Sequence, residues 1–144
     1  MELLIIFVVI SFLVGTISFA LPSKSAKEIS ELRMNASRLG FKISPSNIGQ
    51  NSFKNKDVNL MIYSFKNQTK LKEAHFIRDK DEFILYSPLK LKYSNEYDEL
   101  KSKINSLSPC VLEIIFSNSS IAFIWREKDG IGELVKILDL LKVF

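Results

Sequence analysis

The side chains that most often carry catalysis or bind metals are scarce in this chain and far apart. His75 is the only histidine, and Cys110, the only cysteine, lies 35 positions further on. A zinc site needs three or four ligands at a recognisable spacing, and this pair does not supply one. We interpret His75 as a solvent-facing residue of a strand over 72–78 and Cys110 as a small buried residue. The sequence predicts no metal, no cofactor and no internal disulfide.

Motifs for phosphate binding and for nucleophilic catalysis are also missing from the sequence. The five glycines form no G-x-x-x-x-G-K or G-x-G-x-x-G arrangement, and the pair Gly130 and Gly132 is followed by Glu133, which repels an anion. No G-x-S-x-G elbow occurs. The acidic residues around Asp79 lack the spacing of a calcium loop, so we interpret them as a polar turn. The sequence therefore predicts a protein that is not an enzyme.

The one tryptophan lies where a strand over 121–125 leads into a charged turn. One interpretation is that Trp125 is a large core residue that closes the sheet beneath the last helix. The other is that Trp125 and Arg126 form an exposed contact for a protein partner, because Trp and Arg are enriched where interfaces bind most tightly. Both interpretations stay open at the level of the sequence.

The strongest signal in the chain is its first segment, residues 3–21, which has nineteen residues and no charge. As a helix it covers roughly 28 Å, close to the thickness of the hydrocarbon core of a bilayer. We expect a transmembrane helix, since a buried core helix is usually shorter. A cleaved signal peptide is the alternative, because Ser18 and Ala20 are small residues at cleavage-type spacing. Within the span, Ser11 and Gly15 form a small-xxx-small pair that favours a homodimer.

Basic residues lie directly after the span and none precede it. Lys24, Lys27, Arg33 and Arg38 all fall within about 20 residues of its end, which predicts that the following domain is cytoplasmic. We expect these four side chains to contact anionic headgroups of the bilayer. Residues 24–72 carry a net charge of +7 and residues 73–144 one of −2. Since the lysines are scattered without interleaved aromatic motifs, no nucleic acid is expected as a partner.

The remaining sequence predicts one antiparallel α+β domain. Residues 22–57 are expected to form a juxtamembrane helix over 26–39, which starts at a capping box of Ser25 and Glu28, a short strand at 41–43, and a polar linker. Residues 58–144 are expected to form the soluble domain. Its strands are predicted at 58–63, 72–78, 82–87, 89–93, 111–116 and 121–125, with the run 89–93 at a sheet edge. Helices are predicted from Asn95 to Leu107 and from Gly130 onward, which gives about three helices after the span.

Three short motifs carry a resemblance to known proteins. The span ends in Leu-Pro-Ser at 21–23, the charged helix closes in Leu-Gly at 39–40, and a late strand ends in Ile-Trp-Arg-Glu at 124–127. In this layout the chain resembles a group of short, uncharacterised, single-pass bacterial inner-membrane proteins, a resemblance that implies no reaction. The accessory subunit of the bacterial preprotein translocase has a similar outline, but its Pro-Gln-rich basic motif is not found here and its role is not transferred.

From these features we expect a single-pass protein of the inner (plasma) membrane. Its cytosolic α+β domain is expected to be a non-enzymatic interaction or accessory module with the lipid bilayer and another protein as partners. The alternative is a periplasmic binding domain released by cleavage of a signal peptide.

Overall fold

The computed structural model describes residues 1–20, 22–45 and 60–144. The chain divides into two compact units, Met1–Glu31 and Leu32–Phe144. The boundary between the units lies within the predicted juxtamembrane helix. Most of the predicted polar linker, and the first residues of the strand expected at 58–63, lie outside the described residues.

The first helix, α1 (Glu2–Ala20), coincides with the predicted span and buries none of its side chains. In the part of the chain that the structure describes, α1 is the one helix long and apolar enough to cross a membrane, a test that signal sequences also pass. Two of its three hydroxyl groups are bonded within the helix: the Thr16 Oγ1 donates to the Leu13 carbonyl and the Ser18 Oγ to the Val14 carbonyl, both at 2.9 Å. Such internal bonds are what an apolar solvent requires of a polar side chain.

The second helix, α2 (Lys24–Arg38), begins two residues before the predicted start. The Ala26 N–H donates to the Ser23 hydroxyl at 3.2 Å, so Ser23 caps the helix and the predicted capping box at Ser25 is wrong. At the other end Gly40 has φ +91°, a left-handed conformation that side chains with a Cβ rarely adopt. This glycine turns the chain directly into the first strand.

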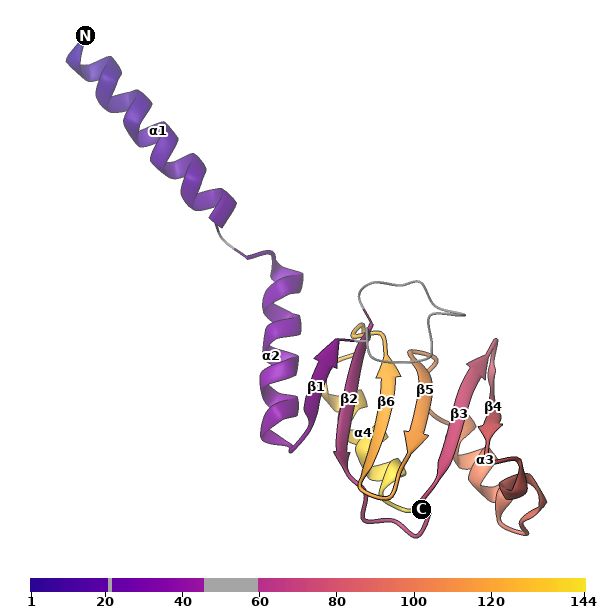
Figure 1. Cartoon of the computed structure of the whole chain (residues 1–144). Coiled ribbons are helices and arrows are strands. Elements are labelled where there is room, and N and C mark those ends of the chain that lie inside the picture. Colours follow the sequence, from indigo (N-terminus) through magenta and orange to yellow (C-terminus); the bar gives the residue numbers. More distant parts are fainter. Residues whose placement is uncertain (21, 46–59) are drawn as a thin grey trace. The chain divides into compact units, whose positions relative to one another are not determined.

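Leu32–Phe144 is built on a six-stranded antiparallel sheet, so the predicted α+β class is confirmed (Figure 1). The strand order is β1-β2-β6-β5-β3-β4, which makes β1 and β4 the edges. The strands are β1 (Lys42–Pro45), β2 (Met61–Lys66), β3 (Ala74–Asp79), β4 (Glu82–Ser87), β5 (Val111–Phe116) and β6 (Ser120–Trp125). The predicted hairpin of the last two strands is present, with Ser117 and Ser120 bonded across its turn.

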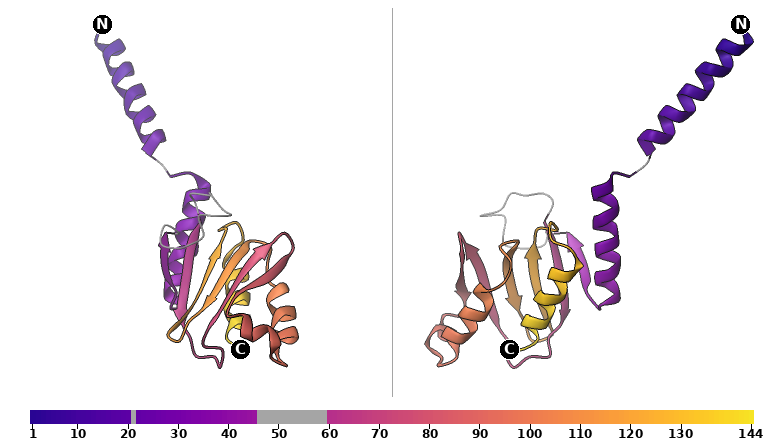
Figure 2. Two further views of the ribbon diagram at one scale, coloured as in Figure 1. Left: turned by 45° about the vertical axis from the view of Figure 1, so that its right-hand side comes forward. Right: turned by 180° about the vertical axis from the view of Figure 1, so that it is seen from behind.

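Two helices, α3 (Tyr97–Asn105) and α4 (Ile131–Leu141), cover one face of this sheet, as the two views of Figure 2 show. Alternate residues of each strand face these helices and form an aromatic-rich core. Phe41, Tyr63, Phe123 and Trp125 stack edge to face or in parallel, with ring centroids 5.5–6.2 Å apart. From the helices, Ile104, Leu134, Ile137 and Leu141 are fully buried against them. The most apolar predicted helix is therefore part of the core.

The segment predicted as an edge strand, 89–93, is instead a 3₁₀ helix, η2 (Leu89–Tyr93). Its backbone bonds are local: the Leu91 N–H donates to the Pro88 carbonyl and the Ser94 N–H to the Leu91 carbonyl, both at 3.1 Å. The edge strand on this side of the sheet is β4, whose Phe83 N–H donates to the Asn105 side chain of α3 at 2.8 Å rather than to a further strand. Because α3 occupies this position on β4, residues 89–93 have no free strand edge to pair with, despite their alternation of Leu and Lys.

Candidate functional site

The sheet face opposite α3 and α4 carries a row of side chains that runs across the strands. The strand register places Ile84, Ile77, Glu113, Ile124 and Ile62 next to one another in this order. Neither α3 nor α4 packs on this face, here called the open face, which is turned to the viewer in Figure 1. Ile84 at the edge is 51% exposed, whereas Ile124 and Glu113 in the middle are buried. The open face is thus mainly aliphatic with one acidic group at its centre.

Glu113 is paired with His75 of the neighbouring strand. The His75 Nε2 contacts the Glu113 Oε1, and both side chains are largely buried, at 16% and 6% exposure. Tyr86 of β4 packs edge-on against the imidazole, with the ring centroids 5.0 Å apart. His75 therefore does share a face with Ile77, as the alternation predicted, but its assignment as a solvent-facing residue is wrong. The sequence held no signal for this pair, since its partners are 38 positions apart.

A second buried carboxylate lies at the end of the sheet near α2. Glu127 accepts hydrogen bonds from the Arg33 Nε at 2.9 Å, the Arg33 Nη2 at 2.6 Å and the Tyr63 hydroxyl at 2.6 Å. The Glu127 side chain is 6% exposed and that of Arg33 is 40% exposed. Burial, followed by the bond to Glu127, raises the pKa of Tyr63 well above its usual value, and the hydrogen bond to Glu127 raises the pKa of Arg33. This cluster attaches the second half of α2 to the sheet.

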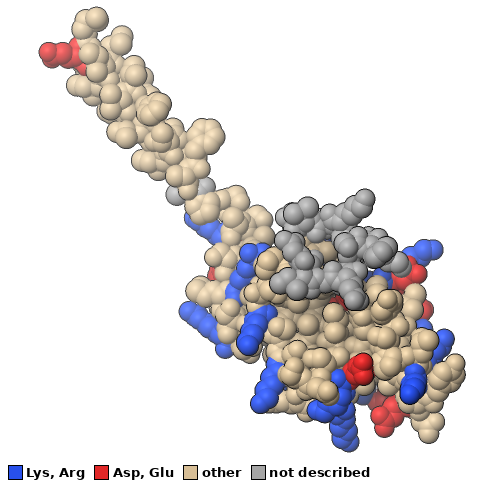
Figure 3. All heavy atoms as spheres, viewed as in Figure 1, with Lys and Arg blue, Asp and Glu red and all other residues tan. Residues whose placement is uncertain are grey.

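The four residues predicted to contact lipid do not share one environment in the structure. Lys24, Lys27 and Arg38 are exposed on α2, while Arg33 is bound to Glu127. Contact with headgroups stays a prediction for all four, and for Arg33 it competes with the ion pair. On the face of the folded unit that Figure 3 shows, the visible basic side chains are scattered rather than gathered in one patch.

Trp125 is fully buried, so the prediction that it offers an exposed partner contact is wrong. Its ring packs against Tyr63 and Phe123 in the core, which is the other interpretation that the sequence left open. The indole N–H is buried and makes no well-formed hydrogen bond to a described residue. Its closeness to the Tyr63 hydroxyl opposes part of the rise in the pKa of Tyr63. Arg126 is partly exposed, and its role as a partner contact stays a prediction.

A third charged side chain, Arg78, has an internal role that the sequence did not reveal. The Arg78 guanidinium donates to the carbonyls of Leu107 and Ser108 at 3.2 and 3.1 Å and to that of Val111 at 2.7 Å, and it lies 4.2 Å from the centre of the Phe83 ring. Burial lowers the pKa of Arg78. Arg78 thus joins the segment after α3 to the sheet.

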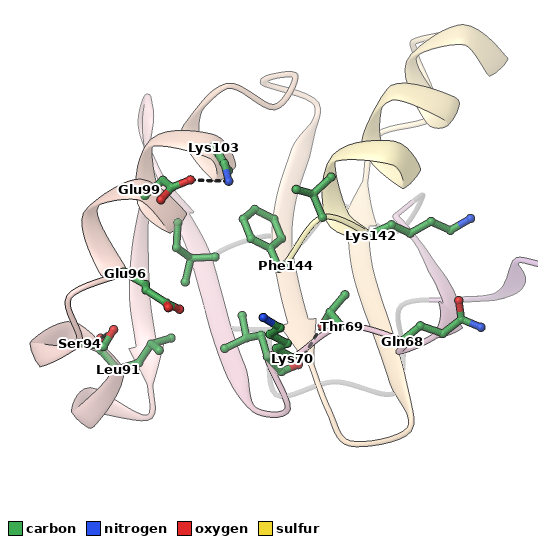
Figure 4. A pocket seen from close by; sticks show the side chains of 13 residues that line it. Gln68, Thr69, Lys70, Leu91, Ser94, Glu96, Glu99, Lys103, Lys142 and Phe144 are labelled. Atoms are coloured by element: carbon green, nitrogen blue, oxygen red, sulfur yellow. Dashed lines mark hydrogen bonds and ion pairs between the residues drawn. The ribbon is translucent and has the colours of Figure 1, made fainter.

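A cavity of about 520 Å³ opens between η2, α3, the loop after β2 and the C-terminal residues (Figure 4). Leu71, Leu91, Leu100 and Phe144 supply its apolar lining. Glu99 and Lys103 pair with each other on one side at 2.7 Å, and Lys142 points away on the other side. The labelled polar groups therefore do not converge on one point, as those of a catalytic pocket do.

In the described ranges, no group of three or more His, Cys, Asp or Glu side chains is placed to hold a metal ion. Cys110 is partly buried, and burial together with the neighbouring Asp129 raises the pKa of its thiol, which makes it less reactive. Comparisons of the chain with protein-family models, with curated proteins and with solved structures found no match.

Proposed function

We propose that this chain is a single-pass protein of the inner (plasma) membrane whose folded unit is a non-enzymatic module that binds another protein at the cytosolic membrane surface. The observation that carries the proposal is α1, a helix of nineteen residues with no buried side chain and with its Thr16 and Ser18 hydroxyls bonded internally. So much exposed aliphatic surface is stable in lipid and not in water. The basic residues that follow it favour a cytosolic folded unit.

The open face of the sheet supports the binding of a protein. Its accessible part lies at the β4 edge, where Ile84 is 51% and Tyr86 is 60% exposed, and this suits a partner that brings an apolar surface.

Photocrosslinking in native membranes tests the binding role. A photoreactive residue at Ile84, on the open face, should give a discrete crosslinked protein. The same residue at Lys136, which is 77% exposed on α4, should not. Crosslinking that is equal at the two positions contradicts the proposal, because it indicates random collisions with neighbouring proteins.

The second candidate function is a processed periplasmic domain that binds a component of the envelope. It is favoured by the small residues Ser18 and Ala20 and by the end of α1 at Ala20. A mature chain that begins at Leu21 supports this candidate. A chain that keeps its span, with a reporter after Phe144 active on the cytosolic side, supports the membrane-anchored form.

A homodimer through the span is a further part of the proposal. Nothing lies within 4 Å of a Cβ added at Gly15, so a larger residue fits the single helix. Gly15→Ile should therefore weaken crosslinking between two copies without affecting the folded unit. Unchanged crosslinking argues against the Ser11–Gly15 face.

A further inference from the structure

The 3₁₀ helix η2 exposes four neighbouring side chains that together form a small apolar and basic surface, the η2 patch: Leu89, Lys90, Lys92 and Tyr93. Leu89 is 66% exposed and Tyr93 is 87% exposed. Leu91, between them, is turned inward and packs against the core. Figures 1 and 2 show this short helix, between β4 and α3, at the edge of the folded unit.

The two lysines of the η2 patch are available for an external partner. Neither has an ionic partner in residues 60–144, whereas Lys101, Lys103 and Lys136 each pair with a glutamate. No acidic residue occurs between 83 and 95. The glutamates that follow, Glu96 and Glu99, line the cavity of Figure 4, which the four patch residues do not line. Asp98 is, along the sequence, the nearest exposed acid that does not line this cavity.

We propose that the η2 patch rests on the headgroup region of an anionic lipid bilayer, with Leu89 and Tyr93 inserted and Lys90 and Lys92 against the lipid phosphates. This inference rests on the proposed membrane anchor, which holds the folded unit close to the bilayer.

The chemistry of the patch matches that of a bilayer surface. Tyrosine is enriched where a membrane meets water, because its ring is apolar and its hydroxyl is polar. Lysines bind the negative surface of anionic membranes, and a long lysine side chain reaches the phosphates while its stem lies in apolar surroundings. Four side chains are a weak contact on their own. A tether raises the effective concentration of lipid, so a weak contact is sufficient.

The test uses the full chain in protein-free vesicles with and without anionic lipid. Tyr93→Cys in a Cys110→Ser background carries an environment-sensitive fluorophore, and Lys136→Cys in the same background is the matched control. In anionic vesicles the emission of the probe at position 93 should move to shorter wavelength and gain intensity several-fold, while the emission of the probe at 136 stays as in water.

Lys90→Glu with Lys92→Glu should lower the ratio of docked to undocked protein by about tenfold or more. Asp98→Asn should raise it.

Three results overturn the inference. The first is a probe at 93 that reports water as the probe at 136 does. The second is a response at 93 that is unaffected by the charge reversals and by anionic lipid. The third is a response that occurs in native membranes but not in protein-free vesicles, which assigns the patch to a protein. Carbonate washing of the same vesicles separates the two proposals: loss of the chain means that the anchor fails, and a retained chain with a water-exposed probe means that only the patch contact fails.

Discussion

Arg33 and Glu127 lie 94 positions apart in the sequence and form a two-pronged ion pair, with Nε and Nη2 of the arginine at 2.9 and 2.6 Å from the two carboxylate oxygens. The pair joins α2, the helix that follows the proposed anchor, to the chain just after β6. Because Glu127 is buried, the pair also keeps a charge inside the fold satisfied.

The first prediction concerns this pair. Arg33→Ala leaves the buried Glu127 with Tyr63 as its remaining side-chain donor among the described residues and should lower the free energy of unfolding by about 2 kcal/mol, less than for a fully buried pair because Arg33 is partly exposed. Lys136→Ala removes an exposed ion pair and should cost at most about 0.5 kcal/mol. Urea unfolding of the full chain in mild detergent, followed by Trp125 fluorescence, measures both. Equal losses for the two variants would show that the Arg33 pair adds no more than a surface contact.

The second prediction is an alkaline instability that depends on Tyr63. Its pKa in the folded protein is raised above the unfolded value of 10.0, mainly by burial and then by the bond to Glu127. A raised pKa means that folding favours the protonated form of Tyr63. The stabilisation that protonated Tyr63 contributes is therefore fully present below pH 10 and is lost as the pH rises above 10.

Tyr63→Phe removes the titrating group and one hydrogen bond. The variant should be less stable than the original protein by about 1 kcal/mol at pH 8, and the difference should shrink between pH 10 and 11.5. Urea midpoints over this range are the measurement, with the exposed Tyr86→Phe as control. A difference that stays constant with pH contradicts the assignment.

The third prediction concerns Arg78, which binds three backbone carbonyls after α3. Arg78→Ala leaves these acceptors without their donor and should cost about 2–3 kcal/mol of stability. Arg78→Lys should recover little of the loss, because an ammonium group cannot reproduce the planar fork of donors. Lys128→Ala, at an exposed position, serves as the control and should change the urea midpoint hardly at all.

The fourth prediction separates a core helix from a docking helix at the C-terminal end. Truncation after Asp129 removes α4 with Leu134, Ile137 and Leu141, which are all fully buried. The loss of three such side chains costs several kcal/mol, comparable to the whole stability of a small domain. The truncated chain should therefore lack a cooperative unfolding transition. A cooperative transition in the truncated protein contradicts the placement of α4 in the core.

The order of most elements could be predicted from local patterns, because those patterns are strong. The alternation in 82–87 and in the hairpin of β5 and β6 gives strands, and the stripe from Ile131 to Leu141 gives a buried helix. The prediction of a strand at 89–93 was wrong because alternation indicates which side chains share a face, not whether a neighbouring strand is free to pair. The neighbouring strand β4 is not free at Phe83, where Asn105 of α3 accepts its N–H.

The candidate site was harder to predict than the fold. The alternation placed His75 on the face of Ile77 correctly, but the proximity of Glu113 depends on the β3–β5 register, which requires the fold. Arg33 was expected at the membrane because its position in the sequence is close to the span, whereas its partner Glu127 follows the last strand. Trp125 was ambiguous because a tryptophan at a strand end suits a core and an interface equally well.

Extraction of native membranes with alkaline carbonate tests the central claim most directly. The account predicts that the full-length chain stays in the membrane pellet with an intact N-terminus, and that a variant with Val9→Arg and Leu13→Arg in α1 moves to the soluble fraction. Release of the unmodified chain by carbonate, or a mature protein that lacks the residues of α1, would contradict the account.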